Sequence, residues 1–188
     1  YGHPDCDGRS HASGVCVPGG ADVLHTSLDL RAVAQEASAA EPAEGCRDSA
    51  CVQVSRDAGR YLCEYIYYKS LHSAAQQAER ATAAGHPTVA PKVLFVHVPP
   101  LDQPYTLLQT AAALRAILKA CLRQVRAERN TACELASVLG GSDVATAALL
   151  LSKNGGSVDA AANAYFEQLE RGVPAAPPLA AAVQAPAG

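Results

Sequence analysis

The feature that most constrains the fold of this sequence is the apolar run at residues 92–101, KVLFVHVPPL, which ends in two prolines. A continuous apolar stretch of this length, closed by Pro-Pro, is typical of a strand buried on both faces of a parallel sheet. A shorter β-branched stretch, CVQVS at 51–55, precedes a glycine-containing turn and a helical pattern that begins near Asp57 or Ala58. These stretches predict a strand-turn-helix unit followed by a second strand of the same sheet.

Helical patterns flank the two predicted strands. Residues 26–37 predict a short helix with Ser27 as its N-cap, and residues 105–129 place apolar side chains at the spacing of one long amphipathic helix. The Ala-rich segment 74–91 is interpreted as an inserted loop or a frayed helical extension. We therefore predict an α/β protein, a three-layer α/β/α sandwich with a mostly parallel sheet. Because the chain contains no Met and opens on a Gly- and Asp-rich loop, we expect the N-terminal part of this domain to be missing.

A change of composition separates a second part of the chain, in which three short helical patterns are divided by the loops GGS and NGGS. Ser142 or Asp143 is placed to cap the second of these helices, and Ser157 the third. The last segment has too little apolar surface to form a core. We predict a catalytic-type domain at residues 1–129, a small three-helix bundle at 130–172 and a disordered tail at 173–188.

Charge and cysteine content argue against several classes of function. Fifteen Lys and Arg against 18 Asp and Glu give a net charge of -3, and no basic run could follow a phosphate backbone, so we expect no nucleic-acid partner. No apolar run reaches the roughly 20 residues needed to span a bilayer, so we expect no membrane partner. The seven cysteines are scattered without a disulfide framework. This pattern favours reduced thiols in a soluble, cytosolic protein.

Cys63 and His97 form a candidate catalytic pair. Cys63 lies in the first turns of a predicted helix, where free backbone N–H groups and the helix dipole favour a thiolate. Taken alone, Cys63 is more often an inert buried thiol and His97 a core histidine. However, the helix that carries Cys63 starts after one predicted parallel strand, and His97 lies toward the carboxyl end of another. In a parallel sheet these two places lie at the same edge. The imidazole could there take the thiol proton and later protonate a leaving amine.

The stretches DAGRYLCEYIYYKSL (57–71) and FVHVPPL (95–101) resemble the nucleophile and histidine motifs of the pyroglutamyl peptidase I family of cysteine peptidases. The resemblance covers about residues 1–129 and implies that Cys63 is the nucleophile and His97 the general base and acid. It further implies removal of N-terminal pyroglutamate (5-oxoproline) from peptides, with no metal and no cofactor.

The family's catalytic Glu and the aromatic residues of its ring pocket precede the part that this chain resembles. No third catalytic residue can therefore be assigned, and we expect the chain to be inactive on its own. The residues of the first motif that we interpret as supports of the turn and helix start are Asp57, Gly59 and Arg60.

Two further groups of residues have alternative interpretations. Four residues of the N-terminal loop are of zinc-ligand type, but their spacing matches no zinc pattern, so we predict no metal site. These are His3, Cys6, His11 and Cys16. The tyrosines of the helix that carries Cys63 are interpreted as core and surface aromatics in preference to substrate contacts. These are Tyr61, Tyr65 and Tyr68.

Within residues 130–172, the stretch GGSVDAAANAYFEQL resembles the last helix of ubiquitin-associated-like (UBA-like) three-helix domains. The resemblance implies ubiquitin as a candidate partner. Gly140 is followed by Gly141 and Ser142, where ubiquitin binders present an apolar residue, so a helical packing or dimerisation module is the alternative. For the whole protein, the alternative to a peptidase is a non-catalytic adaptor of the ubiquitin pathway.

Overall fold

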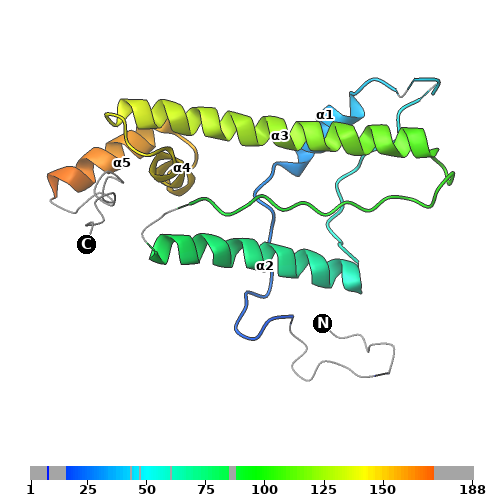
Figure 1. The fold of residues 1–188 in the computed structure, drawn as a ribbon, viewed down its shortest axis with the longest axis horizontal. Coiled ribbons are helices and arrows are strands. Elements are labelled where there is room, and N and C mark those ends of the chain that lie inside the picture. Colours follow the sequence, from blue (N-terminus) through cyan, green and yellow to red (C-terminus); the bar gives the residue numbers. More distant parts are fainter. Residues whose placement is uncertain are drawn as a thin grey trace, which may run out of the picture. The chain divides into compact units, whose positions relative to one another are not determined.

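The structure is a computed structural model of the 188-residue chain. It describes residues 8, 16–42, 44–46, 48–59, 61–84 and 88–171. The helices of this part are α1 (Leu30–Ser38), α2 (Leu62–Ala83), α3 (Leu107–Val138), α4 (Val144–Lys153) and α5 (Val158–Glu170) (Figure 1). The chain divides into a first unit, residues 1–77 and 90–124, and a second unit, residues 78–89 and 125–188. No helix of the described residues is long and apolar enough to cross a bilayer.

The prediction of a three-layer α/β/α sandwich is wrong, because the described residues contain helices and no strand. Residues 51–55 and 92–100 are irregular segments in Figure 1. A strand exists only where its backbone pairs with a neighbour in a ladder, and no backbone hydrogen bond joins these two described segments. Apolar and β-branched composition therefore correctly predicted that these two segments are not helical. It could not show whether another segment pairs with them to form a sheet.

The first unit is built around a small apolar cluster between α1 and α3. Leu94, from the segment 92–98, packs against this cluster, while the ring of the next residue, Phe95, lies 5.9 Å from the ring of Tyr67 on α2. The segment therefore has helices on both sides and presents consecutive side chains to each in turn. The buried members of the cluster are Val33 and Ala37 of α1, and Ile117 and Ala120 of α3.

Side-chain caps explain where the helices of this unit begin. Asp29, and not the predicted Ser27, is the N-cap of α1: its carboxylate accepts hydrogen bonds from the backbone N–H of Arg31 and Ala32, both at 3.0 Å. At the start of α3, the Thr106 hydroxyl accepts from the backbone N–H of Gln109, whose side-chain carbonyl accepts from the backbone N–H of Thr106. This reciprocal pair is a capping box, and it fixes the start of the long helix.

A side-chain amide joins α3 to the start of α1. The carbonyl oxygen of Gln124 accepts from the backbone N–H of Asp29 at 3.1 Å, and its amide group donates to the backbone carbonyl of Asp29 at 3.0 Å. One side chain thus satisfies both backbone groups of the cap residue. The two helices are held together by this clamp as well as by their apolar contact.

The second unit has a closed apolar core. Leu135 is fully buried, and the side chains around it on the three helices are mostly alanine, so the helices approach closely. Asp143 caps α4 by accepting from the backbone N–H of Thr146, and Ser157 caps α5 by accepting from that of Ala160, which confirms both predicted caps. The remaining buried residues of this core are Ala132, Ala136, Leu139, Ala147, Leu151, Ala161 and Ala162.

Two helices extend further along the chain than predicted. α2 begins at Leu62 and continues to Ala83, so the first ten residues of the segment 74–91 are regular helix. α3 runs without interruption through position 130, where the composition changes. The predicted tail, 173–188, lies outside the described residues.

Candidate functional site

Cys63 is the second residue of α2 and is half-buried. The loop before it is organised by short side chains: the Ser55 hydroxyl donates to the backbone carbonyl of Asp57, and the Asp57 carboxylate accepts from the backbone N–H of Gly59 at 2.9 Å. Gly59 has φ of +87°, a conformation that L side chains rarely adopt. The turn made by Gly59 explains why α2 begins at Leu62 and not near Asp57.

His97 is exposed and lies on the segment between α2 and α3. Its ring meets the ring of Phe95 edge-on, with the two centroids 4.9 Å apart. The same segment is anchored upstream by Thr26, whose hydroxyl donates to the backbone carbonyl of Val93 at 2.6 Å and accepts from the backbone N–H of Leu28. His97 is therefore positioned by the ring of Phe95 and by the hydrogen bond that the Thr26 hydroxyl donates to the backbone at Val93.

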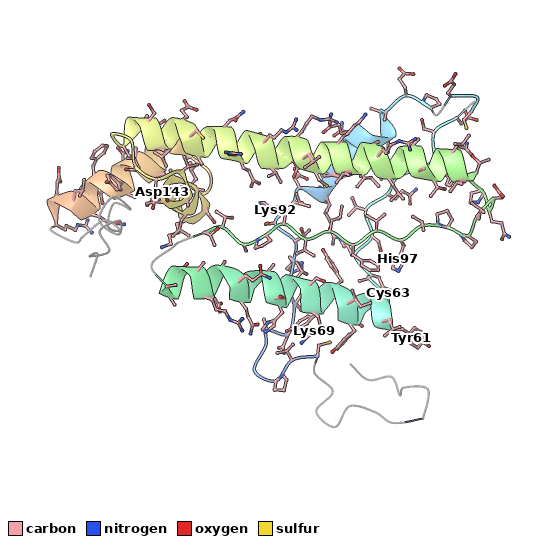
Figure 2. The ribbon with its side chains drawn as sticks, viewed as in Figure 1. Tyr61, Cys63, Lys69, Lys92, His97 and Asp143 are labelled. Carbon is pink, nitrogen blue, oxygen red and sulfur yellow. The ribbon has the colours of Figure 1, made fainter. Side chains whose placement is uncertain are left out.

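The structure brings Cys63 and His97 close to the same residue, Gly59. A Cβ placed on Gly59 would lie 3.7 Å from Cβ of Cys63 and 3.9 Å from Cε1 of His97. Both distances start from the same Cβ position, so Cβ of Cys63 and Cε1 of His97 are no further apart than the two distances added together. Figure 2 shows both side chains at the same end of α2. What requires glycine at position 59 is its positive φ, since these contacts are ordinary van der Waals distances.

No hydrogen bond between Cys63 and His97 is present among the described residues, and none joins His97 to a carboxylate there. The two side chains are thus close but not hydrogen-bonded to each other, an arrangement that is common in catalytic pairs before a substrate is bound. Carboxylates do lie in the same unit, around an open groove of about 930 Å³ that His97 also lines. They are Asp22, Asp29, Asp57 and Glu64.

Tyr67 is a residue of this region that the sequence did not single out. Burial raises the pKa of its phenol, while a hydrogen bond with Thr26 acts in the opposite direction. Tyr67 also lines the groove and contacts Phe95, the neighbour of His97. Its interaction with Thr26 joins residues 41 positions apart, and no local sequence pattern indicates such a contact.

The other tyrosines in and next to α2 occupy varied surroundings. Tyr61, at the start of the helix, is 65% exposed, whereas the Tyr68 hydroxyl donates to the backbone carbonyl of Ala21 at 2.6 Å. The hydrogen bond of Tyr68 does not involve Cys63 or His97. The interpretation of these residues as core and surface aromatics stays a prediction.

Arg60, a residue of the predicted nucleophile motif, lies outside the described part of the chain. Three of the four zinc-ligand-type residues of the N-terminal loop also lie outside it. Those three are His3, Cys6 and His11. Cys16 is described and is a free, half-buried thiol. Within the described ranges, no group of three or more His, Cys, Asp or Glu side chains could hold a metal ion.

Comparison with known proteins places these observations in a family. The family model described as pyroglutamyl peptidase matches residues 3–134, which include both motifs. The chain belongs to the pyroglutamyl peptidase family. Its membership confirms the family resemblance inferred from the stretches around Cys63 and His97.

Among curated members of the pyroglutamyl peptidase family, a human pyroglutamyl-peptidase 1-like protein is 33% identical over 133 residues, 70% of this chain and 56% of the relative. Mouse pyroglutamyl-peptidase 1 is 35% identical over 119 residues, 63% of this chain and 47% of the relative. The chain thus spans about half the length of the curated relatives that it matches. No solved structure matches it.

Proposed function

We propose that this protein is a cysteine peptidase that removes N-terminal pyroglutamate from peptides, with Cys63 as the nucleophile and His97 as the general base and acid. The observation that supports the pair is that both residues lie close to Gly59, Cys63 on the first turn of α2 and His97 on the segment between α2 and α3. Family membership supports the reaction, because the mouse relative is named a pyroglutamyl-peptidase.

In the proposed reaction, His97 accepts the thiol proton of Cys63, and the thiolate attacks the carbonyl carbon that joins pyroglutamate to the next residue. The tetrahedral adduct collapses, the C–N bond breaks, and His97 protonates the leaving amine. Water, deprotonated by the same imidazole, then hydrolyses the thioester. Free pyroglutamate leaves, and the thiol of Cys63 is restored.

The isolated chain is proposed to have no peptidase activity. No carboxylate bonds to His97 among the described residues, and the edge-on contact with Phe95 does not fix the tautomer of the ring. A catalytic histidine usually needs a partner that fixes both its tautomer and its orientation. An orienting carboxylate is therefore the feature to seek in the full-length protein. The six described cysteines are free, which is consistent with action in the reducing cytosol.

The test is a Cys63→Ala substitution in the full-length protein, assayed with pyroglutamyl-aminomethylcoumarin as a fluorogenic substrate. Loss of a nucleophile should lower turnover by at least about 1,000-fold. Cys133→Ala is the matched control, because this exposed thiol belongs to the second unit, and it should keep normal turnover. Retained activity in the Cys63 variant would exclude the proposed nucleophile.

A second proposed function is ubiquitin binding by a UBA-like domain at residues 130–172. It is supported by the closed core around Leu135 and by two exposed apolar side chains on α5, Phe166 and Leu169, which are 46% and 47% exposed. Chemical shifts of ¹⁵N-labelled ubiquitin should change on addition of the full chain, and Phe166→Ala should weaken the effect. Gln168→Ala, on the same helix, is the control. Ubiquitin binding without peptidase activity of the full-length protein would favour the adaptor function.

A further inference from the structure

One face of α3 carries a row of exposed leucines, named here the leucine stripe: Leu107, Leu114, Leu118 and Leu122. Their exposed fractions are 63%, 39%, 60% and 45%, which are high values for leucine in a folded unit. At 100° per residue the four side chains fall within an arc of about 80°, and they extend along roughly 22 Å of the helix. The stripe is therefore a continuous apolar surface and not a set of isolated side chains.

The leucine stripe is separate from the face by which α3 is anchored. Ile117 and Ala120 are the buried residues of this helix in the first unit, and they pack against Val33 and Ala37 of α1. On a helical wheel, Ile117 and Ala120 lie on one side and the stripe on another. α3 therefore has a second apolar face, which the first unit leaves open.

The charges beside the leucine stripe are all positive. Between residues 107 and 127 the sequence has four Lys or Arg residues and no Asp or Glu. Arg123 is paired with Glu36 of α1, whereas Arg115 and Lys119 are exposed and form no ion pair in the described part of the chain. These two free cations follow directly after Leu114 and Leu118 and so border the stripe on one side.

We propose that the leucine stripe binds an acidic amphipathic helix of a partner protein. The partner would place apolar side chains at i, i+4 and i+7 on the leucines, and carboxylates opposite Arg115 and Lys119. About 15 residues of helix, some four turns, would match the 22 Å of the stripe. Opposite charges along one edge would set the direction in which the partner lies.

Two other occupants fit this surface less well. A second copy of the chain would bring Arg115 and Lys119 of both copies to one seam, with no acidic residue between positions 107 and 127 to compensate. A flat bilayer suits a convex helix that is open along its length, whereas Leu114 lines the open groove of the first unit. A protruding partner helix can enter such a hollow, and a membrane surface cannot follow it.

The test uses the full chain and a synthetic 16-residue helical peptide with leucines at i, i+4 and i+7 flanked by glutamates. Binding is measured by fluorescence anisotropy of the labelled peptide, and a dissociation constant in the micromolar range is expected, weakening as salt is raised. Leu118→Asp should weaken binding at least about 10-fold, because the acidic group would meet the apolar anchor. Leu101→Asp, equally exposed but outside the helix, is the control and should have no effect.

A charge-reversed variant gives a second measurement that does not alter the stripe. Arg115→Glu combined with Lys119→Glu should weaken binding at least about 10-fold and make it less sensitive to salt, whereas Arg80→Glu on α2 should not. Equal binding by Leu118→Asp and the unmodified chain would overturn the proposal. So would concentration-dependent dimerisation through the stripe in sedimentation, or preferred binding to phosphatidylserine vesicles over the peptide.

Discussion

Replacing Gly59 by alanine should damage the candidate pair far more than it damages folding. Gly59 has φ of +87°, and its backbone N–H is held by the Asp57 carboxylate at 2.9 Å, so the turn cannot relax freely. A residue with a side chain in this left-handed region costs about 1 to 2 kcal/mol. The added methyl itself would make only ordinary contacts, at 3.7 Å to Cys63 and 3.9 Å to His97.

The effect on catalysis follows from where that strain is released. A turn that rotates toward a negative φ moves the start of α2, and with it Cys63, relative to His97. A misplacement of about 1 Å in a reacting pair costs on the order of 100-fold in rate. We therefore expect kcat/KM of the full-length protein to fall by about 10- to 100-fold, while the free energy of unfolding falls by only about 1 to 2 kcal/mol.

The assay is hydrolysis of pyroglutamyl-aminomethylcoumarin, measured beside urea unfolding of the same preparations. Gly19→Ala is a matched control, because Gly19 also has a positive φ, +72°, but nothing lies within 4 Å of its added Cβ. It should lose similar stability and keep its activity within about twofold. If both variants keep normal kcat/KM, or both lose it equally, the turn at Gly59 does not position the pair and the reasoning is refuted.

Three further predictions concern stability and thiol reactivity. Leu135→Ala should lower the free energy of unfolding by about 2 to 5 kcal/mol, because this side chain is fully buried. Val138 is 53% exposed, so Val138→Ala should lower it by less than about 0.5 kcal/mol. Urea unfolding followed by circular dichroism measures both variants. Because burial raises the pKa of the Cys121 thiol, iodoacetamide at pH 8 should alkylate it several-fold more slowly than exposed Cys51, as measured by mass spectrometry. Because burial raises the pKa of Tyr67 above its usual value of 10.0, the contribution of its neutral phenol to stability should be full below that pH and be lost as pH rises above it. Urea unfolding of the Tyr67→Phe variant should therefore show a smaller alkaline loss of stability.

Local signals in the sequence predicted the existence of the helices and the caps of the last two. Asp143 and Ser157 cap α4 and α5 as expected, because a capping side chain bonds to backbone groups only two or three residues away. The wrong cap predicted for α1 is only two residues from the observed one. Ser27 and Asp29 are both good capping residues, but only the backbone of Asp29 is also bonded by Gln124. A choice between neighbouring caps thus depended on a residue 95 positions away.

The predicted sheet failed because it required information that no single segment contains. The composition of residues 92–98 excludes a helix but cannot say whether a second segment will pair with the backbone. In the first unit, Leu94 and Phe95 instead bury their side chains between two helices without a ladder. Likewise, α3 continues past position 130 because no glycine or proline interrupts it, although the composition changes there.

The proximity of Cys63 and His97 was expected from the meeting of two strands at a sheet edge, and it occurs without that edge. Cys63 is placed by the Asp57–Gly59 turn, which is a local structure encoded within the motif that resembles the family. His97 is placed by contacts distant in sequence: Thr26 holds the backbone at Val93, and Tyr67 supports Phe95. The nucleophile motif therefore carries its own geometry, whereas the histidine motif depends on the rest of the first unit. Perturbations that loosen this unit should accordingly displace His97 before they displace Cys63.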